Sequence, residues 1–176
     1  EIYLYLEKKK SSIVSHSERN QMLEKIEKHL QALGIEYQKG YVNEQLAIVT
    51  EYGFRTVYFR IVIVPMILNY VDEDRKDKWI FAKCKLCDVE DFTEKERLSL
   101  FRAALEIQYN HPEITYSLNK NGFFIEFDVL PDISLPNFSE EFFSIGDGIE
   151  ALASLIWDLA PRRREPILEK IDLGES

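Results

Sequence analysis

Two cysteines lie three residues apart in the segment FAKCKLCDVED, at Cys84 and Cys87. A Cys-x-x-Cys pair can supply half of a zinc site or a redox disulfide. Residues 78–89 form a long β-rich run, however, and are expected to be a strand, in which successive side chains point to opposite faces. Cys84 would then lie with the core residues and Cys87 with the lysines. We therefore expect neither a metal site nor a redox site here.

Acidic residues cluster in two places beside this strand. Asp88, Glu90 and Asp91 follow the cysteines, and residues 72–74 lie in a highly charged stretch. Clustered carboxylates can bind Mg²⁺ or Ca²⁺. Neither cluster has the glycine-punctuated spacing of an EF-hand loop, so both are interpreted as solvated loops.

Histidines and glycine-rich motifs offer little further chemistry. His16, His29 and His111 are scattered, with His29 expected on the polar side of a helix and His111 in a loop. No nucleophile elbow, Walker loop or dinucleotide-binding fingerprint occurs. We therefore expect no catalytic residue, no cofactor and no enzyme activity. The alternative is a small ligand-binding domain or enzyme with a cleft between the sheet and the final helix.

Size and charge narrow the class of protein. The 176 residues fit one core, and 45% hydrophobic with 30% charged residues is typical of a globular domain. The net charge of -9 argues against nucleic acid as the main partner, because phosphate binding needs a basic surface. Two basic runs, residues 8–10 and 162–164, are interpreted as solvated flanks, and nucleic-acid binding through them is a weaker alternative.

The expected location is the cytoplasm. No apolar stretch approaches the roughly 20 residues that span a bilayer, so no membrane association is expected. The first residues lack the charge order of a signal peptide. Two cysteines make no disulfide framework, which favours a reducing compartment.

The first half of the chain predicts one helix and a meander of strands. Ser15 and Glu18 have the spacing of a capping box, and an apolar stripe then runs to Gly34, where the helix should end. Residues 35–42 look extended. Three strands are predicted at 45–51, 55–65 and 78–89, with a hairpin turn at 52–54 and a charged loop at 69–78.

The second half predicts a helix, a hairpin and a final helix. Thr93 and Glu96 form another capping box, and the helix over 94–109 must end before Pro112. A hairpin follows, with strands at 113–118 and 123–131 around an Asn-Gly turn at 121–122. The last helix, from about 138 to 160, contains Gly146 and Gly148 and is expected to kink or divide near Asp147.

The predicted order is therefore α-βββ-α-ββ-α, an α+β fold with an antiparallel sheet. Residues 15–160 form a single domain, residues 1–14 an N-terminal extension and residues 161–176 a C-terminal tail.

This order of elements resembles the fold of type III secretion chaperones and YbjN-like proteins. The resemblance covers residues 15–160. It is carried by the middle helix (98–109), by the strand-turn-strand ITYSLNKNGFFIEFDVLP, and by the final helix with Phe142 and Trp157. The charged loop and the basic run after the last helix depart from the family pattern.

The resemblance implies a non-catalytic protein-binding module, commonly a homodimer, that holds an extended segment of a partner protein. The middle helix has two apolar rows, which form the candidate dimer or partner interface: Leu98, Phe101 and Leu105 on one, and Leu100, Ala104 and Ile107 on the other. One row could cover the sheet while the other meets a second subunit. Alternatively, both rows form one wide core face.

Overall fold

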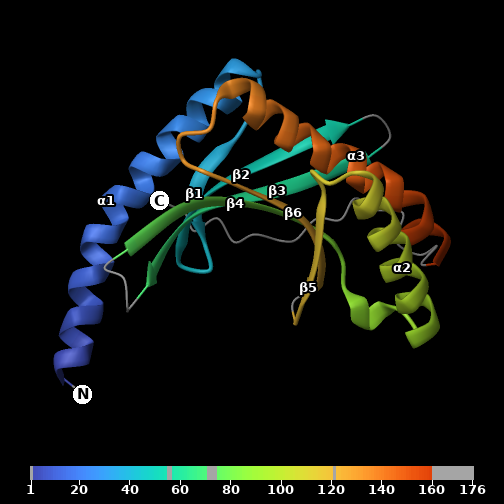
Figure 1. Ribbon diagram of the computed structural model, residues 1–176, viewed down its shortest axis with the longest axis horizontal. Coiled ribbons are helices and arrows are strands. Elements are labelled where there is room, and N and C mark those ends of the chain that lie inside the picture. The colour runs from blue at the N-terminus through green and yellow to red at the C-terminus, as the bar shows by residue number, and fades with distance from the viewer. Residues whose placement is uncertain (1, 55–56, 71–74, 121, 160–176) are drawn as a thin grey trace.

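The computed structural model describes residues 2–54, 57–70, 75–120 and 122–159 (Figure 1). The elements are, in chain order, α1 (Ile2–Ala32), β1 (Gln38–Val42), β2 (Gln45–Phe54), β3 (Val57–Tyr70), β4 (Arg75–Cys87), the 3₁₀ turn η1 (Val89–Asp91), α2 (Glu94–Asn110), β5 (Thr115–Asn119), β6 (Gly122–Val129) and α3 (Leu135–Leu159). The predicted α+β class is confirmed. The residues of the predicted tail, 161–176, and of the basic run within it lie outside the described residues, as do the acidic residues 72–74.

One six-stranded antiparallel sheet has the order β1-β2-β3-β4-β6-β5, and the three helices lie along one of its faces (Figure 1). The first meander has four strands where three were predicted. The additional strand, β1, comes from the segment that looked extended. It joins β2 through Asn43 and Glu44, whose φ angles of 48° and 63° are those of the tight turn that matches the twist of a hairpin.

The hairpin turn predicted at residues 52–54 is wrong. Tyr52 pairs with Phe59 and Gly53 with Tyr58, so these residues belong to the strands. The Tyr52 side chain packs against the core, with its ring 6.0 Å from that of the buried Phe59 between centroids. Strands β3 and β4 likewise extend into the predicted charged loop, up to the pair of Tyr70 with Arg75.

Helix α1 begins at Ile2, so the start predicted at Ser15 is wrong. Its predicted end is confirmed. Gly34 has φ 69° and donates its N–H to the Gln31 carbonyl, while Ile35 donates to the Leu30 carbonyl at 2.9 Å. These two bonds form a Schellman motif, and the buried Ile35 and Leu30 side chains supply its apolar contact.

Helix α2 begins with the predicted capping box, in which the Thr93 hydroxyl accepts from the Glu96 N–H and the Glu96 carboxylate accepts from the Thr93 N–H. Helix α3 is one continuous helix, so the division expected near Asp147 is absent. Gly148 serves another purpose there, because a Cβ at this position would lie 2.3 Å from Ile125 of the sheet. The glycine lets the α3 backbone approach β6 closely.

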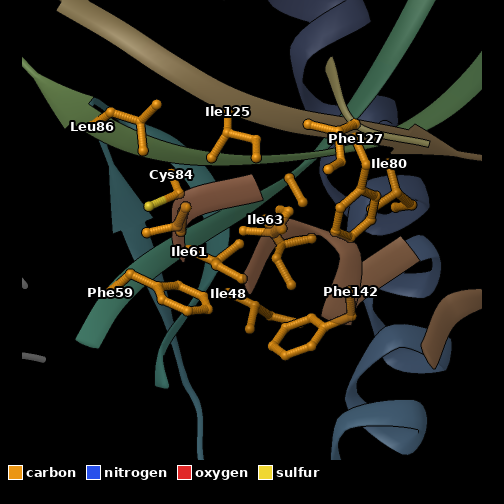
Figure 2. Close-up of a cluster of buried hydrophobic side chains, with 14 of the residues drawn as sticks. Ile48, Phe59, Ile61, Ile63, Ile80, Cys84, Leu86, Ile125, Phe127 and Phe142 are labelled. Atoms are coloured by element: carbon orange, nitrogen blue, oxygen red, sulfur yellow. The ribbon is translucent and has the colours of Figure 1, made fainter. Parts of the chain in front are cut away.

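The core fills the space between the helices and one face of the sheet. One row of paired residues, Ile48, Ile63, Ala82 and Phe127, crosses β2, β3, β4 and β6 on the helix side. Figure 2 shows Ile48, Ile61 and Ile63 directed towards Phe142 of α3. All of them are buried. The region between sheet and final helix, where the alternative prediction placed a cleft, is occupied by apolar side chains.

Candidate functional site: two surfaces and an open sheet edge

The two cysteines are both buried, which corrects the prediction for Cys87. A β-bulge separates the pair of Lys85 with Phe124 from the pair of Cys87 with Phe123, so Leu86 is one extra residue in β4. The bulge turns Cys87 towards the core, where strict alternation would have turned it towards the lysines. Burial also raises the pKa of the Cys84 thiol to about 12. Such a thiol is almost entirely protonated at neutral pH and is a poor nucleophile.

The carboxylates beside the cysteines form no metal-binding group. Glu90 and Asp91 lie in η1 and are exposed, and Asp88 pairs with Lys85 at 3.0 Å. Within the described ranges, no group of three or more His, Cys, Asp and Glu side chains is placed to hold a metal ion.

The three histidines have different surroundings. His29 is buried, not on a polar surface as predicted, because its Nε2 lies 2.9 Å from the Ile133 carbonyl and its ring packs 5.3 Å from Phe138. His16 and His111 are exposed. The other buried polar groups, Thr50 and Ser144, donate hydrogen bonds to backbone carbonyls at 2.7 Å. These contacts satisfy the hydrogen-bonding groups of His29, Thr50 and Ser144, each of which bonds to a different backbone carbonyl.

Helix α2 has two apolar faces, and they have different surroundings. Leu100 and Ala104 are 0% and 2% exposed and pack in the core, with Ile107 partly buried beside them. Leu98 and Leu105 are 70% and 65% exposed. Of the six predicted interface residues, Leu100 and Ala104 are therefore in the core, Phe101 and Ile107 are partly buried, and Leu98 and Leu105 face outwards.

The outward row continues to a residue that sequence reasoning missed. Tyr109 is 88% exposed, and Phe101 is partly buried against Phe123. Together Leu98, Phe101, Leu105 and Tyr109 form the α2 stripe, whose spacing of three, four and four residues places them along one side of a helix. Arg102 and Glu106 flank it, and the stripe lines a shallow groove of about 460 Å³.

The second surface lies on the sheet face opposite the helices. Another row of paired residues, Gln38, Val49, Val62, Lys83, Glu126 and Thr115, crosses all six strands on this face. A hollow of about 420 Å³, here called the sheet hollow, is lined by Val42, Asn43, Gln45, Arg60, Val62, Val64, Met66, Phe81, Lys83, Lys85, Asn119 and Phe124. Its floor is apolar and its charged lining residues are basic.

Hydrogen bonds hold the basic residues of the hollow in place. Glu51 accepts hydrogen bonds from Arg60 and from the Tyr58 hydroxyl. The hydrogen bond from Arg60, with a smaller effect of the one from Tyr58, holds the pKa of the Glu51 carboxyl below its usual range. The carboxyl therefore stays ionised. Lys83 pairs with Glu126 at 3.0 Å.

The two edges of the sheet differ. At the β5 edge, the backbone N–H of Tyr116 donates to the side-chain oxygen of Gln108, which α2 places there at 3.1 Å. At the other edge, β1 pairs only with β2 among the described strands. The β1 edge therefore offers a backbone row that a further strand can join.

No protein-family model matches the chain, and no curated protein matches it in sequence. None of the described helices is long and apolar enough to cross a membrane.

Proposed function

We propose that the protein is a non-catalytic protein-binding module that self-associates through α2 and holds an extended segment of a partner protein. One observation carries this proposal: a continuous apolar stripe on α2 is 65–88% exposed at Leu98, Leu105 and Tyr109, although the opposite side of the same helix is buried. Contiguous exposed apolar surface of this kind is typical of interaction sites.

A second copy of the chain fits the α2 stripe because the stripe is self-complementary. If two α2 helices pack antiparallel about a two-fold axis near residue 103, Leu98 of one copy lies near Tyr109 of the other, and Phe101 lies near Leu105. Arg102 then lies close to Glu106 of the other copy, so that a positive and a negative side chain face each other across the interface. Isologous contacts of this kind generate closed dimers.

The extended partner segment binds by joining β1. Addition of a strand to a sheet edge gives affinity through backbone hydrogen bonds, and alternate side chains give specificity. The β5 edge is a poorer acceptor because Gln108 occupies the N–H of Tyr116. In the hairpin of β1 with β2, Val42 and Gln45 close the turn, so the N–H groups of Lys39 and Tyr41 alternate outwards.

The order of elements also supports this proposal. It resembles that of type III secretion chaperones and YbjN-like proteins, which suggests a protein-binding role but no particular pathway. The fourth strand of the meander and the long α1 are additions to that pattern. The filled core between sheet and α3 favours binding over catalysis, and the acidic net charge disfavours nucleic acid.

Light scattering coupled to size-exclusion chromatography tests the self-association. At micromolar concentration the wild-type mass should be twice that of one chain, and Leu105→Glu should give single chains, because a buried unpaired charge costs about 2 kcal/mol or more, roughly 30-fold in affinity. Leu130→Glu is the matched control, since Leu130 is also an exposed leucine but lies outside α2. A monomeric wild type, or equal masses for both variants, contradicts the proposal.

A pair of β1 variants tests the strand addition. Tyr41→Ala and Tyr41→Pro both remove the ring, but only proline also removes the outward N–H. Capture from a lysate of the source cells should recover a partner with wild type and Tyr41→Ala, and lose it with Tyr41→Pro. Equal recovery by the two variants would mean that the partner binds elsewhere.

A further inference from the structure

The sheet hollow lies on a face that none of the described helices covers, yet parts of this face are buried. Ala47, Val49 and Phe124 are 0%, 7% and 9% exposed, and none of them belongs to the core on the helix side. The hydroxyl of Ser117, on the same face opposite Phe124, is buried and has no hydrogen-bond partner within the described part of the chain. Buried hydroxyls normally have a partner. These two features favour a further segment or molecule that covers this face of the sheet.

Charge indicates what would cover it. The lining of the hollow contains Arg60, Lys83 and Lys85 and no carboxylate, in a chain whose net charge is -9. The carboxylates that pair with these cations, Glu51, Glu126 and Asp88, lie outside the lining. Partly exposed ion pairs contribute little, so an incoming carboxylate can exchange with them. An occupant with apolar and acidic side chains fits both the floor and the charged lining.

The segment that follows α3 has this composition. Residues 165–176, EPILEKIDLGES, lie outside the described residues and contain four acidic residues against the single Lys170. Four apolar side chains accompany them: Ile167, Leu168, Ile171 and Leu173. At about 3.4 Å per residue, residues 160–176 can span up to about 58 Å, against a radius of gyration of about 15 Å for a domain of this size. The segment is therefore long enough to reach the hollow from the end of α3 at Leu159.

We propose that residues 165–173 bind in the sheet hollow of their own chain. Their apolar side chains cover the floor formed by Val62, Met66 and Phe81, and their carboxylates contact Lys83 and Lys85. This inference goes beyond the proposed function and does not depend on the α2 stripe or on β1. It makes the hollow a site that the protein occupies itself, so that any other ligand of this face has to displace the segment.

Photochemical cross-linking in the full chain tests this placement. A benzophenone amino acid in place of Leu168 should form cross-links to β3 and β4 residues of the hollow, identified by mass spectrometry. Mixing equal amounts of ¹⁴N-labelled and ¹⁵N-labelled protein separates cross-links within one chain, which carry one isotope, from cross-links between copies, which carry both.

Charge-reversal variants test whether ion pairs hold the segment in the hollow. The double variant Lys83→Glu/Lys85→Glu should lower the yield of hollow cross-links about five-fold, the size expected from two partly exposed ion pairs. Adding Glu169→Lys/Asp172→Lys should restore most of the yield. The matched control is Lys39→Glu/Lys78→Glu, because these lysines also pair with glutamates, at 2.7 and 3.6 Å, but on the helix side of the sheet. It should leave the yield unchanged.

Each result decides the proposal. Single-isotope cross-links to the hollow, lost and restored by the charge variants, support it. Mixed-isotope cross-links show that a second copy supplies the segment and overturn it. Cross-links outside the hollow, or a yield that the charge variants do not change, also overturn it. Thermal unfolding of each variant confirms that a low yield comes from a folded protein.

Discussion

Substitution of Gly148 by alanine tests how closely α3 approaches the sheet. A Cβ at this position would lie 2.3 Å from Cδ1 of Ile125 and 3.1 and 3.2 Å from two carbons of Ile114. Carbon atoms in contact are about 3.5–4.0 Å apart, so Ile125 would have to move by more than about 1 Å. Ile125 is fully buried, and the surrounding core offers it little room.

The magnitude follows from two opposing effects. Overpacking of a core costs about 1–3 kcal/mol, and this contact lies in the upper part of that range. Replacing glycine by alanine inside a helix returns about 1 kcal/mol. We expect Gly148→Ala to lower the free energy of unfolding by about 1–2 kcal/mol, and the melting temperature by about 2–8 °C. Urea and thermal unfolding followed by circular dichroism measure both quantities.

A second substitution separates this steric effect from others. Ile125→Val removes the Cδ1 atom and alone should cost about 0.5–1.5 kcal/mol. Combined with Gly148→Ala it should cost about 1 kcal/mol less than the sum of the two single effects. Ser154→Ala, at an exposed position of the same helix, should change stability by less than about 0.5 kcal/mol. A Gly148→Ala protein as stable as wild type, or additive effects in the double variant, would refute this reasoning.

Two further predictions concern titratable groups. Native protein at pH 8 should release almost no chromophore from a thiol-reactive disulfide reagent, because Cys84 and Cys87 are buried and burial raises the pKa of Cys84 to about 12, whereas both thiols should react in denaturant; fast reaction of one equivalent under native conditions would contradict their burial. Burial, with smaller effects from Asp128, Glu113 and Glu140, raises the pKa of the Glu141 carboxyl above its ordinary value of 4.5. A raised carboxyl pKa means that the folded state holds its proton more tightly, so this contribution to stability is present below pH 4.5 and is lost as the pH rises through the folded-state pKa. Glu141→Gln should therefore raise the melting temperature at pH 7 but not at pH 3.5, and an equal change at both values would contradict the assignment.

Local signals predicted some element boundaries well and others badly. The capping box at Thr93 and the glycine at Gly34 were both confirmed, because each motif satisfies backbone groups that exist only at a helix terminus. The same spacing at Ser15 and Glu18 failed, because the preceding residues continue the helix to Ile2. A motif read over four residues cannot show whether the chain before it is also helical.

Contacts between distant parts of the chain account for the other differences. His29 follows Lys28 on α1, which suggested a polar surface. The residues that contact it, Ile133 and Phe138, come about a hundred residues later in the chain. The bulge that buries Cys87 depends on its register with Phe123 of β6. For α2, the pattern gave two apolar rows but could not show which one meets the core, and Tyr109, at the end of the helix, was not recognised as part of the outward row.

The side chain of Gln108 has a consequence for how copies of this sheet can associate. A sheet that continues edge to edge through many molecules has to use the β5 edge as well as the β1 edge, and the bond from Tyr116 to Gln108 competes with strand addition at β5. Pairing of β1 with β1 remains, and the continuous sheet that it forms ends after two molecules because it uses the same edge of both. One glutamine thus limits the length to which a shared sheet can grow.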